Sequence, residues 1–225
     1  MTVRAVFFDL FETLVTEFEE GRRRSGRAYD YSQLLGLSNE DFKQEWAKRQ
    51  AQRMNGTFGD YPEVIRDIVS GRGLTIDEEA IRSLHESRME EKRLPFHPIR
   101  PAIIKLLKEL RSKQLKIGLI SNCTREEVAE WARSDLSSYF DDALFSYEVK
   151  CAKPDEAIYR LACSRLNVRP DQCLFVGDGG SHELEGARAA GLAVYHAVWF
   201  NSHIESEFPK LRQPGDLLDR WNVLR

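Results

Sequence analysis

The sequence lacks several features that define common classes of protein. It has no apolar run of membrane-spanning length, and its formal net charge is only −3 over 225 residues. Without a long apolar run we expect no membrane partner, and without a basic excess we expect no nucleic-acid partner. Internal repeats and low-complexity segments are also missing, so neither a repeat array nor a compositionally biased chain is expected.

Cysteine is scarce. There are only four cysteines: Cys123, Cys151, Cys163 and Cys173. No two of them have the CxxC spacing typical of metal or redox motifs. The early apolar run at residues 6–10 is short and contains Asp9, so we expect no export signal. The prediction is therefore a cytoplasmic protein with reduced thiols, two of them (Cys163 and Cys173) in the core.

Short apolar segments typical of strands buried on both faces recur along the chain. Strands are expected at residues 3–9, 116–121, 143–148, 172–177 and 192–198. Amphipathic helices are expected at residues 99–113, 124–137, 154–166 and 181–190. The alternation of strand and helix predicts an α/β fold with a doubly wound parallel Rossmann-like sheet.

Residues 16–97 interrupt this alternation. They are charged, mostly helical in period, and contain no convincing strand. The helices expected here span residues 22–36, 39–54, 61–70 and 77–93. We expect this segment to be an inserted all-helical cap over the C-terminal edge of the sheet. The predicted domains are a core of residues 1–15 and 98–225 and a cap of residues 16–97.

Polar side chains follow several of the apolar runs. Asp9 follows the first expected strand, Ser121 and Asn122 follow the second, and Asp178 follows the fourth. Parallel strands bring their C-terminal ends to one edge of a sheet, so these side chains should meet there. Taken alone, each has a simpler interpretation, because Asp often ends a strand and caps a turn.

Lys153 precedes Pro154 and the third expected amphipathic helix. Proline disfavours helical geometry in the residue before it, so the Lys153 ammonium can point into a site at the strand ends. Its positive charge would balance the carboxylates of Asp9 and Asp178 and an anionic substrate. A surface lysine before a helix is the alternative.

Together these segments resemble the haloacid dehalogenase-like hydrolases over nearly the entire chain. Residues 8–14, Phe-Asp-Leu-Phe-Glu-Thr-Leu, resemble the opening Asp-x-Asp-Gly-Thr motif, and residues 177–187 resemble Gly-Asp-x4-Asp-x2-Gly-Ala with Glu183 at the second acidic position. Ser121-Asn122 and Lys153-Pro154-Asp155 resemble the two motifs between them. The resemblance implies that Asp9 is a nucleophile forming a covalent intermediate, with Ser121, Asn122 and Lys153 around the transferred group.

The resemblance also implies a Mg²⁺ site. In phosphatases of this family the ion is bound by the nucleophile, by the backbone carbonyl two residues later and by the first acid of the last motif. The second acid supports the ion directly or through water. Carried over to this sequence, those ligands are Asp9, the carbonyl of Phe11, Asp178 and Glu183.

The first and last motifs point to different members of the family. Phe11 stands where phosphatases carry a second Asp that protonates the leaving oxygen, and Glu12 stands where the motif has Gly. Haloacid dehalogenases also lack that acid and need no metal, but they carry Ser in place of Asp178. We favour a Mg²⁺-dependent phosphatase. The alternatives are a metal-independent dehalogenase-like hydrolase, or a weakly active binding or regulatory protein.

Substrate selection is expected to come from the cap. Trp46, Arg49 and Arg53 have i, i+3, i+7 spacing on the expected helix of residues 39–54. The two arginines are predicted to bind a small anionic substrate through bidentate contacts. An exposed charged helix with one buried Trp is an equally good interpretation. His182 is expected at the surface without a role.

Overall fold

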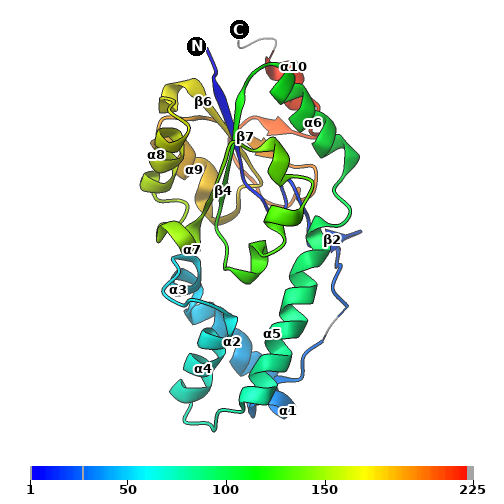
Figure 1. Ribbon diagram of the computed structural model, residues 1–225, viewed down its shortest axis with the longest axis vertical. Helices are drawn as coiled ribbons and strands as arrows, with labels where there is room; N and C mark the ends of the chain where they lie inside the picture. The colour runs from blue at the N-terminus through cyan, green and yellow to red at the C-terminus, as the bar shows by residue number, and fades with distance from the viewer. Residues whose placement is uncertain (1, 27, 222–225) are drawn as a thin grey trace.

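The computed structural model describes residues 2–26 and 28–221, and its centre is one sheet of six parallel strands (Figure 1). The strands are β1 (Ala5–Phe8), β4 (Lys116–Ser121), β5 (Asp142–Phe145), β6 (Cys173–Gly177), β7 (Ala193–Ala197) and β8 (Lys210–Leu211). Their order is β5-β4-β1-β6-β7-β8, so β1 pairs with β4 on one side and β6 on the other. The short strand β8 was not expected from the sequence.

Helices cover both faces of the sheet. Helices α6 (Pro101–Ser112) and α10 (Asp216–Trp221) lie on one side, and α8 (Glu156–Arg165) and α9 (Glu183–Ala189) on the other (Figure 1). Two hydrophobic clusters result, one including Leu106 and Leu110 of α6 and the other including Ile158 of α8. The doubly wound α/β fold predicted from the sequence is confirmed.

A helical unit is inserted between β1 and β4 and lies beyond the C-terminal ends of the strands (Figure 1). It consists of α1 (Tyr31–Leu35), α2 (Asn39–Lys48), α3 (Gln50–Met54), α4 (Tyr61–Gly71) and α5 (Glu78–Arg93), followed by the 3₁₀ turn η1 (Leu94–Phe96). Its core, which includes Ile65 and Ile81, shares no buried member with the two sheet clusters. The boundaries at residues 16 and 97 stay a prediction.

The structure differs from the expected helix at residues 22–36. Strands β2 (Phe18–Glu19) and β3 (Arg22–Arg23) form an antiparallel hairpin instead, and helix begins only at Tyr31. Glu20 and Gly21 both have positive φ, at 50° and 76°. Two consecutive left-handed residues make a hairpin turn whose twist suits paired strands, so this segment reverses direction rather than coiling.

The prediction of a helix at residues 124–137 is also wrong. The segment forms three 3₁₀ turns: η2 (Glu126–Val128), η3 (Trp131–Arg133) and η4 (Ser137–Tyr139). Thr124 does not cap a helix with its hydroxyl; its amide donates to the Glu127 carboxylate at 3.0 Å. Glu127 is in turn 3.1 Å from Arg88 of α5, so contact with a distant helix decides the local geometry.

The expected helix of residues 39–54 is broken at Arg49. This residue ends α2 and precedes α3, with φ −95° and ψ 9°. The break interrupts the i, i+3, i+7 face that the sequence predicted for Trp46, Arg49 and Arg53. A smaller difference concerns residues 143–148, where the strand ends at Phe145 and the short helix α7 (Ser146–Val149) follows.

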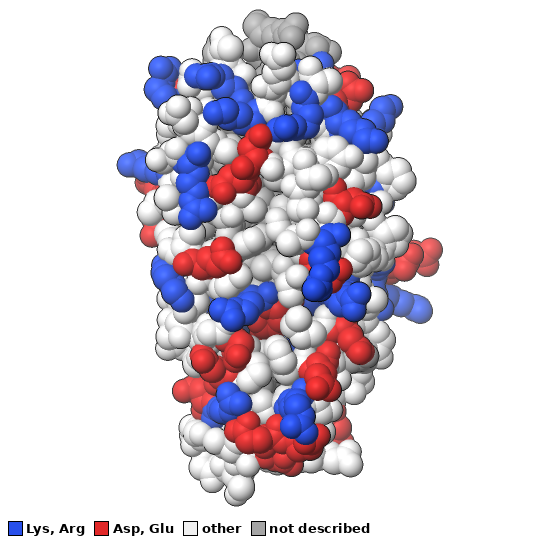
Figure 2. All heavy atoms as spheres, in the orientation of Figure 1, with Lys and Arg blue, Asp and Glu red and all other residues white. Residues whose placement is uncertain are grey.

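Charges of both signs are interspersed on the face shown in Figure 2, with Asp and Glu most crowded at the helical end. Lys and Arg are more frequent around the sheet. Within residues 2–26 and 28–221, no helix has both the length and the apolarity needed to span a bilayer.

Candidate active site

Three neighbouring strands carry polar side chains to one place. Asp9 follows β1, Ser121 ends β4 and Asp178 follows β6, and these strands are adjacent in the sheet. The Asp9 amide donates to the Val176 carbonyl at 2.9 Å, which extends the β1–β6 pairing to the edge. These residues therefore lie at one edge of the sheet, where the strand ends were predicted to bring them.

Lys153 is at the centre of the cluster. Its ammonium contacts the Asp9 carboxylate and lies 2.5 Å from Oε2 of Glu183. All three side chains are buried. Burial works against the charged ammonium, but the Asp9 and Glu183 carboxylates outweigh it and raise the pKa of Lys153. The lysine is thus held as a cation against two carboxylates.

The carboxylates of Asp9, Asp178 and Glu183 form a compact acidic cluster. One oxygen from each lies within 4.8 Å of the others. Burial raises the pKa values of both Asp9 and Glu183, and repulsion from Asp178 adds to the increase. When all three carboxylates are ionised, Lys153 compensates one of the three charges and two negative charges remain. A buried set of oxygen ligands with two excess charges fits a divalent cation such as Mg²⁺.

Asp178 is fixed by contacts on both carboxylate oxygens. The Gly180 amide donates to Oδ1 at 2.9 Å, and the Asn201 amide donates to Oδ2 at 3.1 Å. Buried His196 lies with Nε2 2.8 Å from the Asp178 carbonyl. A carbonyl only accepts, so Nε2 carries the proton and Nδ1 accepts from Ser206. Sequence reasoning missed Asn201, although it follows β7 and the same strand-end argument points to it.

The positions of the Glu183 and Lys153 side chains depend on two closely packed glycines. A Cβ on Gly177 would lie 2.0 Å from Oε1 of Glu183, and one on Gly186 would lie 2.4 Å from the Pro154 carbonyl oxygen. Tyr159 adds a further contact, since its hydroxyl donates to the Glu183 carbonyl at 2.7 Å. The glycines of the last motif therefore allow helix α9, which carries Glu183, to pack close to the site.

We expect Gly177→Ala to weaken Mg²⁺ binding by about tenfold or more, because the added methyl forces the Glu183 carboxylate out of the cluster. Isothermal titration calorimetry with MgCl₂ measures this. Gly215→Ala is the control, since no atom of the described residues lies within 4 Å of a Cβ there. Equal Mg²⁺ affinity of both variants and wild type would contradict a role of Glu183 at the ion.

Ser121 and Asn122 differ in what they contact. The Ser121 hydroxyl is fully buried and has no hydrogen-bond partner in the described part of the chain. The Asn122 side chain instead binds the Lys153 backbone twice, donating to its carbonyl at 2.7 Å and accepting from its amide at 2.8 Å. Ser121 is thus available to a ligand, while Asn122 positions Lys153.

A cavity of about 240 Å³ lies between the sheet edge and the helical unit. It is lined by Phe11, Glu17, Trp46, Gln50, Arg53, Met54, Lys92, Asn122 and Glu127. Phe11, two residues after Asp9, therefore faces the helical unit, as does Asn122. Small-ligand pockets are commonly about 300–1,000 Å³, so this cavity is below the usual size and has room only for a very small molecule.

Arg49 and Arg53 were both predicted to bind the substrate, but only Arg53 lines the cavity. Arg49 is bound by Glu45 at 2.7 Å and by Asp67 at 2.6 Å, away from the cavity lining. The cause is the helix break at Arg49, which rotates it out of the face it was expected to share with Arg53. The helical spacing could not reveal that break.

An ion-pair network that the sequence did not indicate lies at the same cavity. Lys92 of α5 contacts Glu17 and lies 3.1 Å from Glu127. Burial disfavours the Glu127 carboxylate, but Lys92 and Arg88 overcome this and lower the pKa of Glu127 to about 2. The partners come from distant segments of sequence, so no local pattern could have identified them.

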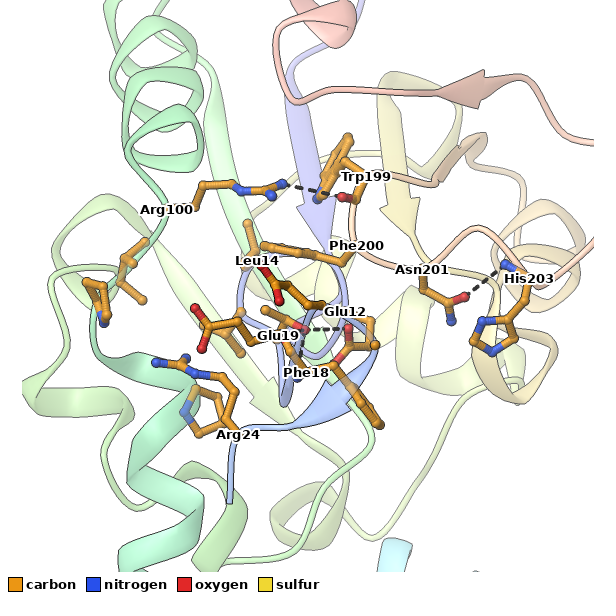
Figure 3. Close-up of a pocket in the computed structure, with 17 residues that line it drawn as sticks. Glu12, Leu14, Phe18, Glu19, Arg24, Arg100, Trp199, Phe200, Asn201 and His203 are labelled. Atoms are coloured by element: carbon orange, nitrogen blue, oxygen red, sulfur yellow. Dashed lines mark hydrogen bonds between the residues drawn. The ribbon is translucent and has the colours of Figure 1, made fainter. Parts of the chain in front are cut away.

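A larger cavity, of about 630 Å³, lies beside the site (Figure 3). Figure 3 shows Glu12, Trp199, Phe200 and Asn201 among the residues around it. Glu12 has φ 55°, and its carboxylate accepts from the Thr16 hydroxyl at 2.7 Å and the Glu17 amide at 2.9 Å. Glu12 thus stabilises the turn after β1 where the resembling motif has glycine. His182 is exposed, as expected.

Comparison with known proteins agrees with this geometry. The model of the haloacid dehalogenase-like hydrolase family matches residues 3–191. The chain is 26% identical to the rhythmically expressed gene 2 protein of Drosophila melanogaster, over 98% of this chain and 90% of that protein. It is 27% identical to N-acylneuraminate-9-phosphatase of Rattus norvegicus, over 88% and 83%.

Solved structures show the same fold. The 2-haloacid dehalogenase of Pseudomonas syringae superposes with a TM-score of 0.70 at 19% identity, over 100% of both chains. A phosphatase of Thermococcus onnurineus superposes with a TM-score of 0.65 at 19% identity, over 97% of this chain and 98% of that one. Phosphatases and dehalogenases are thus both among the similar structures.

Proposed function

Because this chain belongs to the haloacid dehalogenase-like hydrolases, we propose that it is a Mg²⁺-dependent phosphatase acting on a small phosphorylated metabolite. The observation that carries the proposal is the buried cluster of Asp9, Asp178 and Glu183, whose two uncompensated charges suit a divalent cation. A metal-independent dehalogenase would need no such cluster. The similarity to N-acylneuraminate-9-phosphatase supports the same reaction class.

The proposed reaction has two steps at Asp9. A carboxylate oxygen of Asp9 attacks phosphorus, a bond between that oxygen and phosphorus forms, and the bond to the leaving oxygen breaks. Water then attacks the phosphoaspartate, which releases inorganic phosphate and restores the carboxylate.

The surrounding residues stabilise the charge that develops at the phosphoryl group. The Lys153 ammonium, paired with Asp9, balances negative charge, and the unpartnered Ser121 hydroxyl donates to a phosphoryl oxygen. Asn122 keeps Lys153 in position through its backbone. Mg²⁺, held by Asp9, the Phe11 carbonyl and Asp178 with Glu183 beside them, would supply further stabilisation of that charge.

Phe11 limits the substrates that this site can use well. Its ring lines the cavity where the leaving group would lie, and a phenyl ring cannot transfer a proton. General acid–base help is worth about 10²–10⁴-fold. The proposed phosphatase should therefore favour aryl or acyl phosphates, whose leaving groups depart without protonation.

We expect Phe11→Asp to raise alkyl phosphate hydrolysis relative to aryl phosphate hydrolysis by about 10²-fold, because it places a carboxylic acid at the cavity. The measurement is the ratio of kcat/KM values for an alkyl and an aryl phosphate. Phe18→Asp, at an exposed position, is the control. An unchanged ratio in a folded, Mg²⁺-binding Phe11→Asp variant would mean that residue 11 does not occupy the position of the general acid.

A second candidate function is hydrolysis at carbon. The absence of an acid at Phe11 favours it, because halide leaves as an anion without a proton. Asp9 would attack carbon, the carbon–halogen bond would break, and water would hydrolyse the resulting ester. A weakly active binding or regulatory protein is the third candidate, favoured by the same replacement.

A substrate screen with and without Mg²⁺ separates the three candidates. Phosphate release that needs Mg²⁺ supports the phosphatase, and halide release in chelator supports the dehalogenase. Release of neither product supports the binding or regulatory protein. The Asp9→Asn variant is the blank in every assay.

We also propose a cytoplasmic location. All four cysteines are free, and the sulfur atoms of Cys163 and Cys173 lie 3.8 Å apart in the core as thiols. Reduced thiols suit a reducing compartment.

A further inference from the structure

Arg53 is a buried cation without a carboxylate partner. Only 5% of its surface is exposed, and within the described residues it forms no ion pair. Its Nη2 atom donates to the neutral Gln50 side chain, and its Nε atom has no hydrogen-bond partner there. A buried charge is normally paired, because removing an isolated charge from water is costly.

Three neighbouring cations, buried Lys92 and half-buried Arg49 and Arg88, are each paired with a carboxylate. Arg88 and Lys92 each lie 3.1 Å from Glu127, and Arg49 lies 2.7 Å from Glu45. Burial lowers the pKa of Arg53 to about 10, although Glu127 opposes this through space. Arg53 therefore retains a positive charge that the described side chains compensate only at a distance.

The guanidinium of Arg53 is held in a fixed orientation. It stacks on the Trp46 ring at 3.8 Å, and Trp46 itself packs edge-on against Tyr61. Gln50 fixes one of its nitrogen atoms. A stacked, planar guanidinium with unused donors is arranged for bidentate contact with a carboxylate.

Arg53 lines the same cavity as Phe11 and Asn122, which adjoin Asp9 and Lys153. The two carboxylates in the lining, Glu17 and Glu127, both contact Lys92, so their charges are compensated. At about 240 Å³ the cavity admits only a small leaving group. A phosphate group on the leaving group, with nearly two negative charges, would need more cations than Arg53 alone provides.

We propose that Arg53 binds a carboxylate on the leaving group, so that the substrates are small phosphorylated carboxylic acids. This inference rests on the proposed phosphatase function and names its substrate class. Arg53 would be a specificity-determining residue: it binds the end of the substrate opposite the phosphate, and Asp9 attacks the phosphate end.

The binding test uses non-hydrolysable phosphonates, so that it does not depend on turnover. Calorimetry with Mg²⁺ compares carboxyphenylphosphonate with its neutral isostere carbamoylphenylphosphonate, each as the 3- and 4-isomer. For at least one isomer, wild type should prefer the carboxylate by about tenfold or more, equal to about 1.4 kcal/mol. Arg53→Met should abolish that preference, and Arg53→Lys should restore part of it.

Arg49→Met is the matched control, because Arg49 lies outside the cavity lining and should leave the preference intact. Arg53→Met should not lower the midpoint of thermal unfolding, since it removes a charge without a direct partner. A wild type without preference, or Arg53→Met with the full preference, overturns the proposal.

Turnover separates this inference from the proposed function. Carboxyphenyl and carbamoylphenyl phosphates are compared for phosphate release, and the ratio of their kcat/KM values should fall by about tenfold in Arg53→Met. If neither ester is hydrolysed but the phosphonate preference holds, the phosphatase function fails and the carboxylate site remains. If both are hydrolysed at a ratio that Arg53→Met leaves unchanged, the carboxylate site fails and the phosphatase remains.

Discussion

Asp9→Asn is expected to lower kcat by roughly 10⁴–10⁶-fold, a loss typical of removing an enzyme nucleophile. A neutral amide does not attack phosphorus, and the proposed mechanism has no other nucleophile. The change nearly preserves shape. The amide oxygen can still accept from Lys153, and repulsion between Asp9 and Asp178 is removed. Folding stability should therefore change little, as measured by thermal unfolding.

Rapid-quench mass spectrometry of the intact protein provides the direct measurement. The wild type should carry a phosphoryl group during turnover of an aryl phosphate, and Asp9→Asn should carry none. Asp171→Asn, at an exposed residue before β6, is the matched control and should behave as wild type. Substantial activity of Asp9→Asn would rule out the covalent mechanism.

Asp178→Asn is expected to abolish measurable Mg²⁺ binding and lower phosphate release by at least about 10²-fold. The substitution removes one of three charges that the buried cluster offers to a cation. The remaining carboxylates, Asp9 and Glu183, share the single Lys153 ammonium, so only one net negative charge is left for an ion.

Thermal unfolding with and without Mg²⁺ measures the binding. An ion that binds only the folded state stabilises it by about 2.7 kcal/mol at a concentration 100 times its Kd. The wild type should show this increase, and Asp178→Asn should not. Excess chelator should also stop phosphate release by the wild type; full activity in chelator would exclude the metal-dependent mechanism.

Three site residues could be predicted from local sequence because each follows an apolar run at a strand end. Asp9, Ser121 and Asp178 needed only the rule that parallel strands deliver their C-terminal ends to one edge. Lys153 had only the proline after it as a local signal, and Glu183 needed the resemblance, since nothing local shows that their side chains meet. Their contact in the structure depends on Gly186 packing against Pro154.

Two other features differ from the helices that the local pattern predicted. The hairpin at residues 18–23 follows from two left-handed residues, Glu20 and Gly21, within a segment of helical composition. The turns after β4 depend on Glu127 meeting Arg88 of a distant helix.

By itself, the sequence determined the main strands of the sheet, the carboxylates at their ends and the helical character of the insertion, because apolar runs, the residues that follow them and helical period are all local features. Only the tertiary structure decided which residues of the helical unit line the cavity at the sheet edge. The break at Arg49 turned that residue toward Glu45 and Asp67, while Arg53 lines the cavity and forms no ion pair with any residue that the structure describes. Periodicity describes one helix at a time, whereas the partner of a buried charge is chosen by packing between segments far apart in the chain.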